Sequence, residues 1–152
     1  MQIKNRISAF QEEMTAWRHH FHEHPELAYK EINTSKKVVE LLKSFGIDNI
    51  EEGLGKTGIV ATLENGTGKS IGLRADMDAL PILEENNDKK YKSKTDGKMH
   101  ACGHDGHTTM LLGAAKYLSE TRNFNGKVIL IFQPAEEGFA GAKAMIEDGL
   151  LD

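Results

Sequence analysis

Cysteine is almost absent from this sequence. Its 152 residues include one cysteine, Cys102, so no internal disulfide can form and a single thiol remains to be explained. Long apolar runs are also missing. No stretch of about 18 apolar residues occurs, so we expect no membrane span. The first residues lack the apolar core of an export signal, so we expect a cytoplasmic protein.

Positive charge is not in excess either. Lys and Arg number 19 against 23 Asp and Glu, which gives a formal net charge of −4. A protein that binds the phosphate backbone needs a basic surplus, so we expect no nucleic-acid partner. The composition, with 39% hydrophobic and 28% charged residues, is typical of a soluble globular chain. The length predicts one domain, or part of a larger one.

Hydrophobic periodicity predicts helices over residues 2–21, 34–45, 105–119 and 140–148, and strands over residues 58–63, 70–75 and 127–132. The Asn65-Gly66 dipeptide favours a tight hairpin between the first two strands. The apolar run 127–132 suits a strand that is buried on both faces. A strand, a helix and a strand in succession favour a parallel crossover. We therefore predict an α/β fold with three α/β/α layers around a mixed, mostly parallel sheet that includes one antiparallel hairpin.

The segment MHACGHDGH, residues 99–107, is the densest cluster of reactive side chains. Thiol, imidazole and carboxylate groups are the ligands that bind zinc and its neighbours in the divalent series. Cys102 and His104 are two residues apart just before a predicted helix, so both can reach one metal centre, and the helix N-terminus favours a thiolate. Two alternatives remain open: a buried structural cysteine, or a Cys102 nucleophile with His104 or His107 as its base.

Acidic pairs follow two of the predicted strands. Glu136 and Glu137 come directly after the strand 127–132, and Asp76 and Asp78 end the strand 70–75. In open α/β sheets, ligands gather beyond the carboxyl ends of the strands. One glutamate can ligate a metal while the other takes a proton from water, and an aspartate can orient a ligating histidine. Solvated acidic turns are the alternative interpretation.

All three segments are expected on one rim of the sheet. The strand ends that carry Asp76 and Glu136 reach the same rim if the strands are parallel, and the helix that begins near Asp105 has its N-terminus there. Four histidines in residues 19–24 have a spacing that does not converge on one point, and we interpret them as a structural junction between a helix and a loop.

Three segments carry a family resemblance. Residues 74–82 (RADMDALPI), 99–108 (MHACGHDGHT) and 132–138 (FQPAEEG) resemble the M20 metallopeptidase family, in particular its amidohydrolase branch with hippurate hydrolases and auxin–amino acid conjugate hydrolases. Residues 18–27 resemble the N-terminal segment of that branch. The resemblance implies a zinc-peptidase-like catalytic domain that hydrolyses the amide bond of a small N-acyl amino acid with two divalent metal ions, for which zinc, manganese and cobalt all suit the ligand types.

The resemblance also implies residue roles. Cys102, His104 and Glu137 match metal ligands of the family, and Glu136 matches the general base that activates water. Asp76 and Asp78 match the carboxylates at the strand end. Counted from Pro81, Asp78 takes the place of the orienting aspartate of the wider family, and Asp76 replaces a histidine ligand there.

The family resemblance predicts that the chain is incomplete. Family members continue into another ligating histidine, a lid domain through which dimers commonly form, and a final histidine. Residues 1–152 therefore correspond to the N-terminal part of the catalytic domain, and the oligomeric state stays open. We expect this chain alone to bind metal weakly and to hydrolyse little. The alternative is a non-catalytic fragment or binding module of the same fold.

Overall fold

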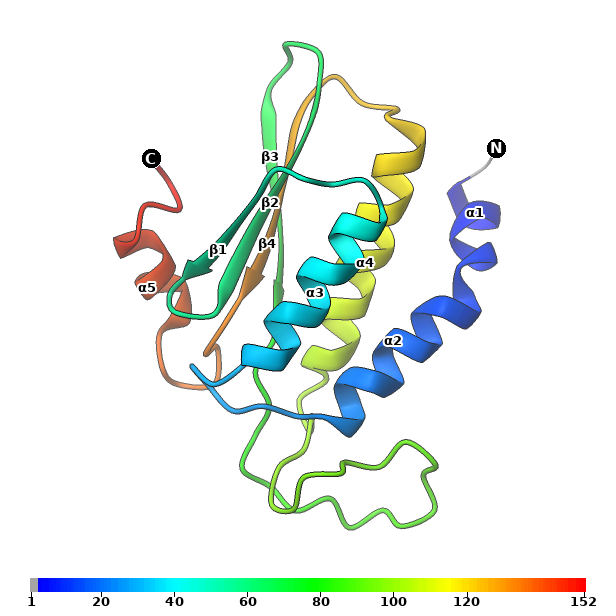
Figure 1. Ribbon diagram of the computed structural model, residues 1–152, viewed down its shortest axis with the longest axis vertical. Coiled ribbons are helices and arrows are strands. Elements are labelled where there is room, and N and C mark those ends of the chain that lie inside the picture. Colours follow the sequence, from blue (N-terminus) through cyan, green and yellow to red (C-terminus); the bar gives the residue numbers. More distant parts are fainter. Residues whose placement is uncertain (1–2) are drawn as a thin grey trace.

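The computed structural model describes residues 3–152 and has the α/β architecture that the sequence predicts (Figure 1). Gln2, where we expected the first helix to begin, lies outside the described residues. None of the helices within residues 3–152 is long and apolar enough to cross a lipid bilayer. The elements are α1 (Ile3–Ala9), α2 (Gln11–Glu23), α3 (Ile32–Ser44), β1 (Ile50–Leu54), β2 (Gly58–Asn65), β3 (Ser70–Asp76), α4 (His104–Thr121), β4 (Gly126–Gln133) and α5 (Gly141–Glu147).

The four strands form one mixed sheet in the order β1-β2-β4-β3. Strands β3 and β4 are parallel neighbours joined through α4, so the predicted crossover is confirmed. The pairs β1–β2 and β2–β4 are antiparallel. Because β3 and β4 are parallel, their carboxyl ends meet at one edge of the sheet, and Asp76 lies in register with Gln133.

The predicted hairpin between β2 and β3 is wrong, because β4 lies between them. Residues 66–69 do not make a tight turn. They cross over the start of β4, where Gly68 approaches the backbone of Asn125 and Gly126 approaches that of Lys69 too closely for any side chain. Glycine at these two positions permits this crossing, which a local turn rule does not anticipate.

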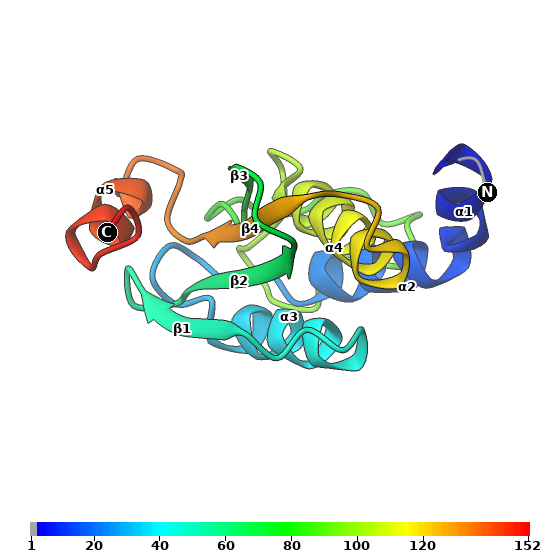
Figure 2. The ribbon, with the colours of Figure 1, turned by 90° about the horizontal axis from the view of Figure 1, so that it is seen from above.

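The helices α3 and α4 cover one face of the sheet (Figure 2), and α2 packs on α4. The core lies in this layer and contains Trp17, Phe21, Val38, Leu42, Ile59, Leu63, Leu112, Ala115, Leu130 and Phe132. The first predicted helix is interrupted at Phe10, which is buried between α1 and α2. Strand β1 was not predicted, because the two glutamates and the glycine between Ile50 and Leu54 leave it without apolar alternation.

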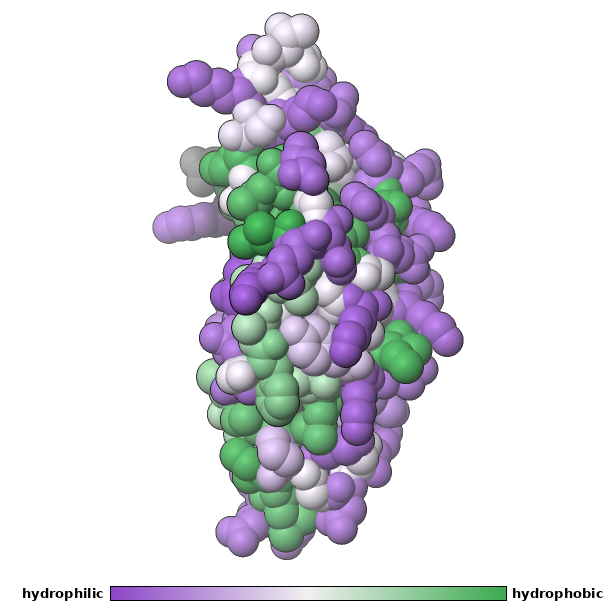
Figure 3. Space-filling model, turned by 90° about the vertical axis from the view of Figure 1, so that its left-hand side faces the viewer, coloured by the Kyte–Doolittle hydropathy of each residue, from purple (hydrophilic) through white to green (hydrophobic). Residues whose placement is uncertain are grey.

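The opposite face of the sheet is only partly covered. Val60, Ile129 and Ile131 point to this face and are half-buried, so β4 is not buried on both faces as the sequence predicted. Figure 3 shows apolar surface among polar side chains on this side of the molecule. Within residues 3–152, the helical layer here is α5, whose Met145 packs against Gly55 and Gly58.

Candidate metal centre

The structure brings the six residues singled out in the sequence to one rim. They come from the end of β3, the segment that follows it, the start of α4 and the turn after β4. The six residues are Asp76, Asp78, Cys102, His104, Glu136 and Glu137. The shared rim that the strand order predicted is therefore present.

Asp78 connects three of these elements. Its side chain is buried, and its two carboxylate oxygens each accept a backbone N–H at 2.9 Å, from Glu136 and from Glu137. Its carbonyl oxygen lies 2.8 Å from His104 Nδ1. Burial raises the pKa of Asp78, but the hydrogen bonds with His104 and with the two N–H groups outweigh burial and lower the pKa below its ordinary value. An ionised Asp78 therefore fixes both glutamates and one imidazole.

His104 directs its second nitrogen into the rim. Because Nδ1 donates to Asp78, the neutral ring has its lone pair on Nε2. That nitrogen lies 3.6 Å from Asp76 Oδ1, 3.7 Å from Glu136 Oε2 and 3.7 Å from Glu137 Oε1. These distances are too long for hydrogen bonds. They are close to the separation of about 3.5 Å expected between two atoms that bind one ion at zinc–ligand bond lengths.

Burial lowers the pKa of the His104 ring, but the hydrogen bond to Asp78 and the charges of Asp76 and Asp78 outweigh burial and raise it. The surrounding carboxylates therefore attract positive charge to this position. A metal cation at this position would balance the same negative charges and leave the imidazole neutral, as a metal ligand must be.

Cys102, His104 and Glu137 have ligand atoms that all lie within 4.8 Å of one another. Glu137 Oε1 is buried and has no hydrogen-bond partner among the described residues. The interaction of Cys102 with Glu137 raises the pKa of the Cys102 thiol. Burial and the charges of Glu136 and Asp76 add to this effect. The carboxylates thus outweigh the helix N-terminus, which we expected to favour the thiolate. An orphaned carboxylate oxygen and a thiol that needs a cation to ionise fit a divalent metal ion with mixed S, N and O ligands.

A second group of ligand-type side chains shares His104. Asp76, His104 and His107 also have ligand atoms within 4.8 Å of one another. His107 Nδ1 lies 2.7 Å from Asp76 Oδ1, while Arg74 Nη1 lies 3.1 Å from the other oxygen of that carboxylate. Sequence reasoning considered His107 only as a possible base. Its position three residues after His104, which places both on one side of α4, was the available signal.

Glu31 is a supporting residue that sequence reasoning missed. Its side chain is buried at the start of α3 and accepts the Ala135 N–H at 2.9 Å and the Thr57 hydroxyl at 2.6 Å. Burial raises the pKa of Glu31, and its hydrogen bonds only partly offset this. Glu31 therefore holds the turn that leads to Glu136. The sequence around Glu31 carries no pattern that distinguishes it from a surface acid.

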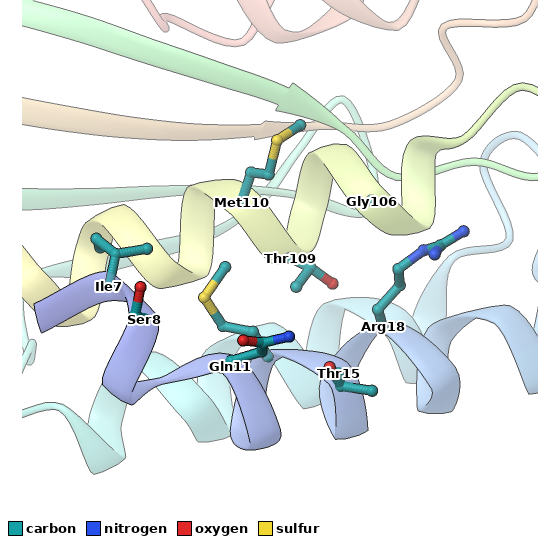
Figure 4. Close-up of a pocket in the computed structure, with 9 residues that line it drawn as sticks. Ile7, Ser8, Gln11, Thr15, Arg18, Gly106, Thr109 and Met110 are labelled. Carbon is teal, nitrogen blue, oxygen red and sulfur yellow. The ribbon is translucent and has the colours of Figure 1, made fainter. Parts of the chain in front are cut away.

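A groove of about 550 Å³ runs between α1, α2 and α4 (Figure 4). It is lined by Ile7, Ser8, Gln11, Met14, Thr15, Arg18, Gly106, Thr109 and Met110. None of the six residues on the rim lines this groove, which is therefore distinct from the candidate metal centre.

The charge of Asp78 gives a pH-dependent prediction. Because its pKa is lowered in the folded protein, it stabilises the fold above the ordinary aspartate value of 3.8, and this contribution is lost as the pH falls through the folded-state pKa. Asp78→Asn should lower the free energy of unfolding by about 2 kcal/mol at pH 7, because a backbone N–H loses its acceptor. Urea unfolding measured from pH 7 to pH 3 should show that the difference in unfolding free energy between Asp78→Asn and the unaltered protein shrinks once the pH falls below 3.8.

Asp88→Asn is the matched control. Asp88 is exposed on the loop between β3 and α4, so its substitution should leave the free energy of unfolding nearly unchanged. A difference for Asp78→Asn that stays constant down to pH 3 would show that the ionised carboxylate does not stabilise the fold.

Known proteins resemble this chain. The pattern of peptidase family M20/M25/M40 matches residues 72–152, which include all six residues of the rim. The hippurate hydrolase of Campylobacter jejuni is 56% identical over 153 residues, which cover 100% of this chain and 39% of that protein. The IAA-amino acid hydrolase ILR1-like 5 of Arabidopsis thaliana is 51% identical over 140 residues, 91% of this chain and 32% of that protein.

A solved structure shares the fold. It is that of the Bacillus subtilis YXEP protein, described as a dinuclear metal binding peptidase from the M20 family. It superposes with a TM-score of 0.89 and 43% identity, covering 95% of this chain and 41% of that one. This chain thus spans about two fifths of the length of the curated Campylobacter relative. On the match over residues 72–152 and these similarities, the chain belongs to peptidase family M20.

Proposed function

We propose that this chain is the N-terminal part of the catalytic domain of a hydrolase that cleaves the amide bond of N-acyl amino acids. The observation that carries the proposal is the convergence of Cys102, His104 Nε2 and the orphaned Glu137 Oε1 on one rim. The substrate class rests on the relatives. Hippurate is N-benzoylglycine, and the Arabidopsis protein is named for conjugates of an acid with amino acids.

Cys102, His104 and Glu137 are the proposed ligands for a divalent metal ion, with Asp76 and His107 beside them. A second ion is proposed because the similar Bacillus protein is described as dinuclear. Zinc, manganese and cobalt all suit this mixture of ligand types. When bound, such ions would polarise the substrate carbonyl and lower the pKa of water.

Glu136 is the proposed general base. The backbone N–H of Glu136 donates to Asp78, and Glu136 Oε2 lies 3.7 Å from His104 Nε2. The side chain of Glu136 is 40% exposed, against 26% for that of Glu137. The carboxylate of Glu136 can therefore accept a proton from the attacking water and return it to the departing amide nitrogen. The neighbouring Glu137, less exposed and with an orphaned oxygen, is better placed as a ligand.

The two aspartates are proposed to act through other residues. Asp78 orients His104 and both glutamates by the hydrogen bonds described above. Asp76 orients His107 at the rim. A cysteine nucleophile is disfavoured, because the carboxylates around Cys102 raise the pKa of its thiol and so keep it from the reactive form.

A non-catalytic fragment or binding module is the second candidate. It is favoured by the length of the match, since this chain spans 39% of the hippurate hydrolase. The proposed ligands of this rim would then bind metal. Hydrolysis with Glu136 as the base would require the rest of such a protein.

Glu136→Gln tests the general base. In a hydrolase that carries this chain as the proposed N-terminal part of its catalytic domain, we expect hydrolysis of hippurate to fall by at least about 100-fold, since the amide cannot accept the proton. Metal content, measured by mass spectrometry of the protein-bound ions, should stay unchanged. Glu147→Gln, at an exposed position of α5, is the control and should keep full activity. Loss of metal from Glu136→Gln would mean that the roles of the two glutamates are reversed.

Cys102→Ala tests the ligand set. Removing the sulfur should lower the bound zinc per chain at a fixed free zinc concentration, because one of the three proposed ligands is gone. Met110→Ala, which shortens an exposed side chain on the same helix as His104, should bind zinc like the unaltered protein. Normal zinc content in Cys102→Ala would remove Cys102 from the ligand set.

A further inference from the structure

A charged network with a buried centre lies next to the segment that carries Cys102 and His104, and it has no part in the proposed reaction. It consists of Arg18 and His22 from α2, Glu84 from the loop between β3 and α4, and Asp105 from the first turn of α4. The side chains of His22, Glu84 and Asp105 are each at most 2% exposed. Buried charges are costly unless they are paired, so a network of this kind needs a reason to persist.

The hydrogen bonds of His22 fit a positively charged ring. Its Nδ1 lies 2.8 Å from Asp105 Oδ2, and its Nε2 lies 3.2 Å from Glu84 Oε1. A neutral imidazole has one N–H, so only the imidazolium can donate to both carboxylates. The hydrogen bond to Asp105 raises the pKa of His22, and the bond to Glu84 adds to it against the effect of burial.

Two further cations contact the same carboxylates, and two aromatic rings lie near His22. Arg18 Nε lies 3.3 Å from Asp105, and Lys89 Nζ lies 3.7 Å from Glu84. The ring of Tyr91 meets that of His22 edge-on with 5.4 Å between the ring centroids, and the ring of His100 lies 6.5 Å from that of His22. Figure 4 shows Arg18 reaching from α2 toward the first turn of α4.

The position of the network along the chain links it to the ligands. Asp105 directly follows His104 and is three residues from Cys102, while Glu84 lies in the loop that leads into this segment. Glu84 also accepts the Ser93 N–H at 2.7 Å, which closes the loop on itself. His22 therefore ties both ends of residues 84–105 to α2.

The ligand segment needs such an anchor. Cys102 is exposed, and Gly103 before α4 has a φ of +104°, so no regular structure holds these residues. We propose that His22 is a positioning residue of the candidate metal centre: its imidazolium holds Asp105 and Glu84 in place, and so fixes the segment that presents Cys102 and His104. This inference rests on the proposed function, because it assumes that these two residues bind metal.

Neighbouring histidines provide matched controls. His24 is exposed, and its Nδ1 bonds to the carbonyl of His20, while His19 stacks on Tyr91. The four histidines therefore do not converge, as the sequence predicted, but His22 has a different role from the others. His24→Gln changes the same residue type on the same segment without touching the network.

The test measures the affinity of the full chain for Zn²⁺ and Co²⁺ by competition with a chelator, together with the absorption spectrum of the cobalt form. His22→Gln removes the positive charge and leaves one donor nitrogen in place of the two ring nitrogens that face different carboxylates. We therefore expect about 10- to 100-fold weaker binding, as for other residues that orient ligands, and an altered cobalt spectrum. Circular dichroism at the same temperature should confirm that the variant is folded. His24→Gln should match the unaltered protein. Wild-type affinity and spectrum in a folded His22→Gln would overturn the inference.

A second variant covers the case in which His22→Gln does not fold. Glu84→Gln leaves His22 paired with Asp105 and removes one of its two carboxylates, at a position 18 residues before Cys102. Its zinc affinity should fall by a smaller but measurable factor, and an unchanged affinity would again overturn the inference. A failure of the proposed function would give a different result. In that case the unaltered protein and His24→Gln would also show no binding of Zn²⁺ or Co²⁺ that involves Cys102.

Discussion

The carboxylate of Asp78 is the interaction on which the candidate site depends. Strands β3 and β4 end side by side because they are parallel, but adjacency alone does not orient the side chains that follow them. Asp78 supplies that orientation, since it accepts the N–H groups of Glu136 and Glu137 while its own carbonyl fixes the ring of His104. One buried acid thus sets the geometry of the proposed base Glu136, the proposed ligand Glu137 and the His104 imidazole, which come from two other segments.

The same rim has an electrostatic requirement. Asp76, Glu136 and Glu137 face one imidazole nitrogen, and the neighbouring carboxylates raise the pKa of the Cys102 thiol. Like charges at this separation repel one another unless a cation lies between them. A divalent ion would stabilise all of these groups in their ionised forms, which explains why the arrangement combines a thiol, an imidazole and several acids.

The N-terminal helices support this rim from behind. Glu31 at the start of α3 holds the turn before Glu136, and His22 in α2 holds the segment after Cys102. Both side chains are buried and ionisable, and each is hydrogen-bonded to a group from a distant part of the chain. Both ligand segments therefore depend on tertiary contacts made by residues far away in sequence.

This dependence explains what the sequence could and could not predict. The period change at residues 58–63, the α4 helix and the motif around Cys102 are local signals, and the elements and clusters that they predict are present. The hairpin at Asn65-Gly66 was predicted wrongly because the insertion of β4 is a long-range event. Glu31 and His22 were not identified because their importance lies in the partners that folding brings to them.

The most direct test of the account is X-ray absorption spectroscopy of the zinc-loaded protein. If Cys102, His104 and Glu137 bind metal together, the zinc edge should report a sulfur neighbour at about 2.3 Å along with nitrogen and oxygen neighbours at about 2.0–2.2 Å. The sulfur contribution should disappear when Cys102 is replaced. A first shell of nitrogen and oxygen alone in the unaltered protein would contradict the central claim that the thiol, the imidazole and the carboxylate share one ion.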